Sequence, residues 1–258
     1  MLVFSVMVFG LSAGSGCGGR DASPAKDSGA DNLRGAAFSG DSVFSLRGLW
    51  VNKAYADTLL LTHSPRASQK VGGETCLYFT DSAEPSVMVP LGWHEGTAWS
   101  IMRDSAKVIL YDSGVKRNMG VVERISPKEI RLGHEYFVKL EHSNQNSYDY
   151  NVVEDLLFAG DYQTESRSTV SLSPDGLANG WDTIRYFEPY VDYIGPGMDV
   201  DQIGLGANKD KLTSYGFKFD KDTLFIYKLK CLLGYDSTDN SCAVVDYGEL
   251  RWKMIKKH

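Results

Sequence analysis

The chain has 258 residues, of which 43% are hydrophobic and 23% charged, and its formal net charge is -6. These values are typical of a globular protein and exclude a disordered chain, a collagen, a coiled coil and a polytopic membrane protein. The negative balance also argues against a broad nucleic-acid surface, which would need clustered basic side chains, so no nucleic-acid partner is expected. At roughly 150 residues per domain, the length predicts one large or two small domains.

The first 16 residues predict a secretory signal. They read MLVFSVMVFGLSAGSG, they carry no charge, and eight of the first nine are apolar. A stretch this short falls below the ~20 apolar residues that cross a bilayer, and no later stretch is comparable. We therefore expect export, with residues 1–16 as a signal peptide and with no transmembrane helix.

Cys17 directly follows this predicted signal. The small residues GSG before it resemble a lipobox, the cleavage motif that precedes the lipidated cysteine of bacterial lipoproteins. Residues 18–42 are rich in Gly, Ala, Ser and Asp, and such a composition buries too little apolar surface to order itself. We therefore expect a lipid anchor on Cys17 and a flexible tether over residues 17–42. The alternative is an ordinary disordered N-terminus after a plain signal peptide.

The remaining cysteines agree with export. Cys231 and Cys242 flank a polar loop between two apolar runs, and a disulfide there would close a loop of about 12 residues. An oxidising compartment permits that bond, which we therefore predict. Cys76 precedes Leu77, Tyr78 and Phe79, a context that predicts a buried strand position rather than a nucleophile.

From residue 44 onward, short apolar runs separated by turn residues dominate, which predicts strands. In residues 107–111 and 129–132 every second side chain is apolar, as a half-buried strand requires. One helix is expected over Lys53–Leu61, with Asn52 as its N-cap, and it would suit a lid over one end of a barrel. The polar residues 143–155 are the natural linker between two halves.

The two halves open alike. Residues 44–50 and 156–162 each place a glycine two positions before a large aromatic, after an apolar lead-in. Each half then offers seven or eight short strands, which suits a small antiparallel up-and-down barrel without exposed edges. We therefore predict an all-β fold with two tandem barrels, over residues 43–142 and 156–258, after the N-terminal tether.

These openings carry a family resemblance. Gly48-Leu49-Trp50 matches the G-x-W signature that opens the first strand of lipocalins, and Gly160-Asp161-Tyr162 is a variant with Tyr for Trp. Together with the lipoprotein start, residues 44–258 resemble the exported lipocalin-like lipoproteins common in Bacteroidetes. The resemblance implies two lipocalin-like barrels whose closed ends hold Gly48, Trp50, Gly160 and Tyr162.

The resemblance also implies that a basic residue of the last strand covers each aromatic. Lys139 is the nearest candidate in the first half, and Arg251 is the candidate in the second. The alternation of Leu250, Trp252 and Met254 directs Arg251 to the opposite face from the core.

Few residues suggest chemistry. The sequence contains no H-E-x-x-H, no Cys/His ladder and no G-x-S-x-G, so we expect no metal, no cofactor and no catalytic residues. His94 and Glu95 lie in a predicted turn, where they could converge on a substrate or form an exposed pair. Asp192, Asp199 and Asp201 crowd one loop, which favours a solvated loop over a calcium site.

A cluster of aromatic residues in the second half offers candidate ligand contacts, namely Trp181, Tyr186, Tyr190 and Tyr193. They would pack in the barrel core, wall an apolar pocket or stack on a sugar. The expected function is a non-enzymatic lipoprotein, anchored in the outer membrane, that binds a small apolar ligand or an envelope partner. The alternatives are a glycan-binding accessory protein of the envelope and an enzyme on a calycin scaffold, which would use His94 and Glu95.

Overall fold

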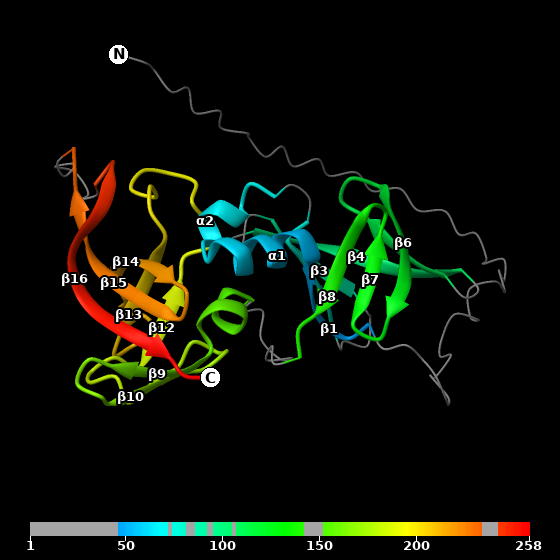
Figure 1. Cartoon of the computed structure of the whole chain (residues 1–258). Helices are drawn as coiled ribbons and strands as arrows, with labels where there is room; N and C mark the ends of the chain where they lie inside the picture. The colour runs from blue at the N-terminus through cyan, green and yellow to red at the C-terminus, as the bar shows by residue number, and fades with distance from the viewer. Residues whose placement is uncertain are drawn as a thin grey trace, which may run out of the picture. The chain divides into compact units, whose positions relative to one another are not determined.

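A computed structural model shows the arrangement of the strands (Figure 1). It describes residues 46–71, 74–80, 86–91, 95–104, 107–141, 152–233 and 242–258. The predicted signal peptide, Cys17, the predicted tether and His94 lie outside the described residues, as does the side chain of Glu95.

The first eight strands form a closed antiparallel barrel. They are β1 (Gly48–Asn52), β2 (Cys76–Phe79), β3 (Ser86–Leu91), β4 (Glu95–Asp104), β5 (Lys107–Asp112), β6 (Arg117–Ser126), β7 (Glu129–Leu132) and β8 (Glu135–Lys139). Each strand pairs with the next along the chain, and β8 returns to pair with β1. This is the predicted up-and-down order, which leaves no free sheet edge.

The second eight strands repeat that order. They are β9 (Gly160–Thr164), β10 (Thr169–Leu172), β11 (Ala178–Asn179), β12 (Tyr186–Pro189), β13 (Gln202–Gly206), β14 (Thr213–Asp220), β15 (Thr223–Cys231) and β16 (Val245–Lys256). The strand β9 pairs with both β10 and β16. In Figure 1, β16 is the long curved strand drawn in red. The remaining gap is spanned by a bridge between Leu177 and Tyr186 and by the Ala178 N–H, which donates to the Arg185 carbonyl at 2.8 Å. The prediction of two small antiparallel barrels is confirmed.

Apolar side chains fill the interior of the first barrel. Trp50, Trp99 and Phe137 are among the largest fully buried side chains of the protein. They pack in one cluster with seven further buried residues, which are Leu77, Phe79, Val87, Leu110, Val122, Ile130 and Leu132. Strand alternation directs these residues inward, so the closed sheet surrounds a packed core.

The outer face of β1 and β2 is buried as well. Leu49 and Val51 of β1 alternate with Trp50 and therefore point outward, yet they are 2% and 0% exposed. They belong to a second hydrophobic cluster, which also contains the core of the second barrel. Both barrels fall within one compact unit, Phe44–His258.

The long connection between β1 and β2 holds two helices, α1 (Lys53–Thr62) and α2 (Pro65–Ser68). The predicted N-cap is confirmed, since the Asn52 side chain accepts from the Ala54 N–H at 2.9 Å. Tyr55 and Leu59 of α1 are buried in the cluster shared with the second barrel. The helix therefore covers the outer side of the first barrel and is not a lid over the interior of that barrel.

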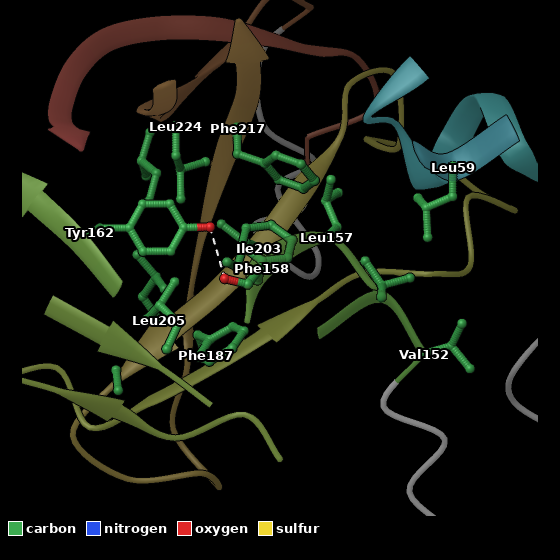
Figure 2. Packing of buried hydrophobic residues seen from close by; sticks show 14 of the residues in the cluster. Leu59, Val152, Leu157, Phe158, Tyr162, Phe187, Ile203, Leu205, Phe217 and Leu224 are labelled. Carbon is green, nitrogen blue, oxygen red and sulfur yellow. Dashed lines mark hydrogen bonds between the residues drawn. The ribbon is translucent and has the colours of Figure 1, made fainter. Parts of the chain in front are cut away.

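Residues 152–158 enter the same shared core. They form a short helical segment that includes the π-helical turn η1 (Glu154–Phe158). Val152 and Phe158 are 0% exposed, and Figure 2 shows Phe158 among Phe187, Ile203 and Phe217 of the second barrel. The described end of the predicted polar linker, residues 152–155, is thus largely buried, since Val152 and Val153 are 0% exposed and Glu154 is 7% exposed.

Candidate functional site

The two predicted barrel-closing motifs have equivalent surroundings. The Trp50 indole Nε1 donates to the Leu46 carbonyl at 2.6 Å. The Tyr162 hydroxyl donates to the Phe158 carbonyl at 2.8 Å, as the dashed line in Figure 2 marks. In both barrels the aromatic polar atom therefore pairs with the residue four positions earlier, which satisfies a buried donor.

A lysine of the last strand covers each of these aromatics. Lys139 Nζ lies 5.4 Å from the Trp50 ring centroid, and the two residues are cross-strand partners. Lys256 Nζ lies 5.8 Å from the Tyr162 ring centroid, and these residues are also cross-strand partners. Partial burial lowers the pKa of the Lys256 ammonium.

The candidate Arg251 is therefore wrong, and Lys256 takes its place. Alternation along β16 places Arg251 on the outward face, where its guanidinium lies 5.5 Å from the Trp252 ring. The motif glycines complete the arrangement, since Gly48 (φ +107°) and Gly160 (φ +141°) adopt backbone conformations that favour glycine.

The predicted disulfide is present. Cys231 and Cys242 are bonded, with their Cα atoms 5.7 Å apart. Cys76 is 0% exposed in β2, as its apolar context predicted, and burial is the main cause that raises the pKa of its thiol. Since the thiolate is the nucleophilic form, this environment suits packing rather than covalent chemistry.

The four candidate aromatics do not form one exposed row. Trp181 is only 3% exposed, and it packs edge-on against Trp252 with ring centroids 5.5 Å apart. Tyr190 is half-buried, and its hydroxyl is 2.6 Å from the Ser214 hydroxyl. The Tyr193 hydroxyl accepts from the Gln202 N–H at 3.3 Å. Tyr186 is half-buried in β12.

The three aspartates of the neighbouring loop have separate structural roles. Asp192 accepts from the Ile194 N–H, and Asp199 accepts from the Val245 N–H at 3.0 Å. Asp201 accepts from the Arg66 N–H at 2.9 Å and so connects the loop before β13 to α2. Across the described ranges, no group of three or more His, Cys, Asp or Glu side chains is arranged to hold a metal.

Trp181 lines a cavity of about 310 Å³ on the second barrel. The wall is contributed by the β9–β10 turn, the segment after β11 and β16. Its lining residues are Thr164, Glu165, Ser166, Ser168, Val170, Gly180, Trp181, Asp182, Arg251, Trp252, Lys253 and Met254. Only Trp181 of the four predicted aromatics belongs to this lining. The sequence did not predict the hydroxyl-rich turn beside it as part of a site, because a short polar segment is typical of an ordinary turn.

A second cavity, of about 290 Å³, lies at the start of α1 on the first barrel. It is lined by Asn52, Lys53, Ala54, Asp57, His134, Glu135 and Tyr136. Lys53 and Asp57 form an ion pair at 2.6 Å, so two charged groups of this wall already satisfy each other.

Comparisons with protein-family models, with curated proteins and with solved structures found no match. Among the described residues, no helix has the length and apolar character needed to span a membrane.

Proposed function

We propose that the chain is a non-enzymatic binding protein of the bacterial cell envelope, anchored by a lipid on Cys17. In this proposal the ligand or envelope partner binds at the outer rim of the barrels. The glycan-binding alternative is a form of this rim binding.

The filled barrel interiors support rim binding over lumenal carriage of an apolar ligand. In the first barrel, fully buried Trp50, Trp99 and Phe137 occupy the interior. In the second, Phe158 packs against Phe217 with ring centroids 5.0 Å apart, beside the fully buried Tyr162 (Figure 2). A carrier of apolar molecules needs an open lumen, whereas these side chains pack as in a protein core.

An apolar probe tests the mode of binding. The mature protein is titrated with a fluorescent fatty acid, and we expect no saturable one-to-one binding. The matched variant Phe217→Ala enlarges the interior of the second barrel and should bind the probe better than the parent. Saturable binding of the probe to the parent, in the interior that Phe217→Ala enlarges, would overturn the proposal of rim binding.

Metabolic labelling tests the anchor. Cells that express the full-length chain are fed an alkyne-bearing fatty acid and then fractionated. We expect label and membrane association in the parent and neither in Cys17→Ala, while Cys76→Ala, which removes a buried thiol, keeps both. Label that survives in Cys17→Ala would remove the anchor from the proposal.

A further inference from the structure

The cavity of about 310 Å³ that Trp181 lines on the second barrel is called the rim cavity below. Its residues offer both hydrogen-bond donors and acceptors. The β9–β10 turn contributes three hydroxyls in mutual contact. The Thr164 Oγ1 lies 2.7 Å from Ser168 Oγ and 2.9 Å from Ser166 Oγ, and the two serine oxygens are 3.0 Å apart. Each hydroxyl has one proton and two lone pairs, so the triangle can turn either kind of group toward a ligand.

Two indole rings form the apolar part of the same wall. Trp252 is half-buried, and the Trp181 ring stands against it at 84°. An aromatic surface beside polar groups suits a ligand with an apolar ring face and a polar edge.

The Trp181 indole N–H is buried and has no hydrogen-bond partner among the described residues. A buried donor without a partner destabilises the free protein, and such groups in native proteins call for an explanation. By contrast, the indole N–H groups of Trp50 and Trp99 are satisfied by the Leu46 carbonyl and the Asp112 carboxylate. The atom has no surface open to the cavity in the free protein, so an acceptor oxygen on a ligand would satisfy the donor of Trp181 only by displacing the wall side chains beside it.

Charge and size narrow the class of ligand. The wall carries two acidic residues, Glu165 and Asp182, and two basic residues, Arg251 and Lys253, so its formal charges balance. A balanced wall favours a neutral ligand over an anion or a cation. The volume of about 310 Å³ lies at the small end of ligand sites, which suits one ring rather than a long chain.

We infer that this cavity binds a neutral, hydroxyl-bearing ring, such as a single sugar unit. The hydroxyls of Thr164, Ser166 and Ser168 would exchange hydrogen bonds with the ring hydroxyls, and the Trp181 N–H would donate to a ring oxygen. The inference deepens the proposed function, since it assumes that the second barrel binds its ligand at the rim.

Nuclear magnetic resonance of the indole N–H groups tests the inference. The mature protein in detergent micelles, labelled with ¹⁵N in tryptophan, is titrated separately with glucose, N-acetylglucosamine and inorganic phosphate. We expect a saturable shift of the Trp181 signal with at least one sugar and none with phosphate. The Trp50 and Trp99 signals should stay in place.

Matched variants make the test specific. The double variant Ser166→Ala/Ser168→Ala lies in an exposed turn and should weaken sugar binding about tenfold, as the loss of hydrogen bonds implies. Ser100→Ala, an exposed serine of β4 in the first barrel, should leave the affinity unchanged. Trp181→Phe keeps an aromatic ring but removes the donor, and it should weaken binding by a similar factor.

Three results would overturn the inference: no sugar moves the Trp181 signal, the serine double variant binds as tightly as the parent, or phosphate saturates the site in place of sugar. These outcomes are distinguishable from failure of the proposed function, because the fatty-acid titration tests for binding in the barrel interior and the Cys17 labelling tests the anchor, both independently of any sugar.

Discussion

Lys256 lies across Tyr162, with its Nζ atom 5.8 Å from the ring centroid, and the two residues face each other on adjacent strands. Lys139 and Trp50 repeat this relationship in the first barrel at 5.4 Å. The repetition extends beyond the opening motifs that the sequence displays, because it includes a residue of the last strand in each barrel. The two halves are therefore two copies of one architecture.

Removal of the covering lysine should destabilise the second barrel. Lys256→Ala eliminates a partly buried cation–π contact and the apolar stem that packs against Gly160, and we expect a loss of about 1–2 kcal/mol in the free energy of unfolding. Denaturant titration measures this loss. Arg251→Ala on the outward face of the same strand removes only an exposed cation–π contact with Trp252 and should cost less, about 0.5 kcal/mol. Equal losses in both variants would contradict the assignment of Lys256.

Gly160→Ala should also destabilise the protein. A Cβ atom at residue 160 would lie 2.8 Å from Lys256 Cε, and the φ angle of +141° strains any other residue. We expect a loss of about 1–3 kcal/mol in thermal or chemical unfolding.

A control separates strain from crowding at this position. Gly195 has a similar φ of +128°, but nothing lies within 4 Å of its added Cβ. Gly195→Ala should therefore lower the free energy of unfolding less than Gly160→Ala does. Equal losses in the two variants would mean that contact with the Lys256 stem contributes little.

Loss of the disulfide should lower the free energy of unfolding, because the unfolded chain gains conformational entropy. Replacement of both Cys231 and Cys242 by Ala frees a loop of about 12 residues, for which the chain-entropy relation gives roughly 3 kcal/mol. Thermal unfolding of the parent, with and without reductant, provides the comparison. A reductant effect that persists in the double variant would show that another group is responsible.

Cys76 should react with maleimide only after the chain unfolds. Its side chain is fully buried, and burial raises the pKa of its thiol, so both access and thiolate formation are suppressed. N-ethylmaleimide labelling followed by peptide mapping should find Cys76 unmodified in the native protein and modified in denaturant. Rapid native labelling at neutral pH would instead indicate a reactive thiol.

Asp201 should make stability depend on acidity. Burial is the main cause that raises the pKa of its carboxyl above the usual value, although Ser64, the Arg66 N–H and Tyr193 favour the charged form. Between the ordinary pKa of about 3.9 and the raised one, the folded chain binds more protons than the unfolded chain. The contribution of Asp201 to the free energy of unfolding therefore falls as pH rises through this window.

The variant Asp201→Asn isolates that contribution. Measured from about pH 4 to about pH 7, the stability of the parent relative to this variant should decline with rising pH. The control Asp210→Asn lies on the exposed turn after β13. Its free energy of unfolding should follow that of the parent across the same pH range. A difference between parent and Asp201→Asn that stays constant, or that grows with pH, would contradict the expectation.

Local patterns in the sequence were enough to predict the strands, the two-barrel fold, the Asn52 cap and the bond between Cys231 and Cys242. Alternation, capping and short loop closure act between residues close along the chain, so they can be recognised from the sequence alone. The lid expected of Lys53–Leu61 shows the limit, because the sequence predicted the helix but not the surface that the helix covers.

Only the tertiary structure decided which lysine covers Tyr162, which face of α1 is buried and where the rim cavity lies. Lys256 meets Tyr162 because barrel closure sets the register of β16 against β9, strands that stand at opposite ends of the second half. The helix of Tyr55 and Leu59 packs on the outer side of β1 because the second barrel supplies an apolar surface there. Long-range pairings of this kind depend on how closed sheets pack, and no local pattern encodes them.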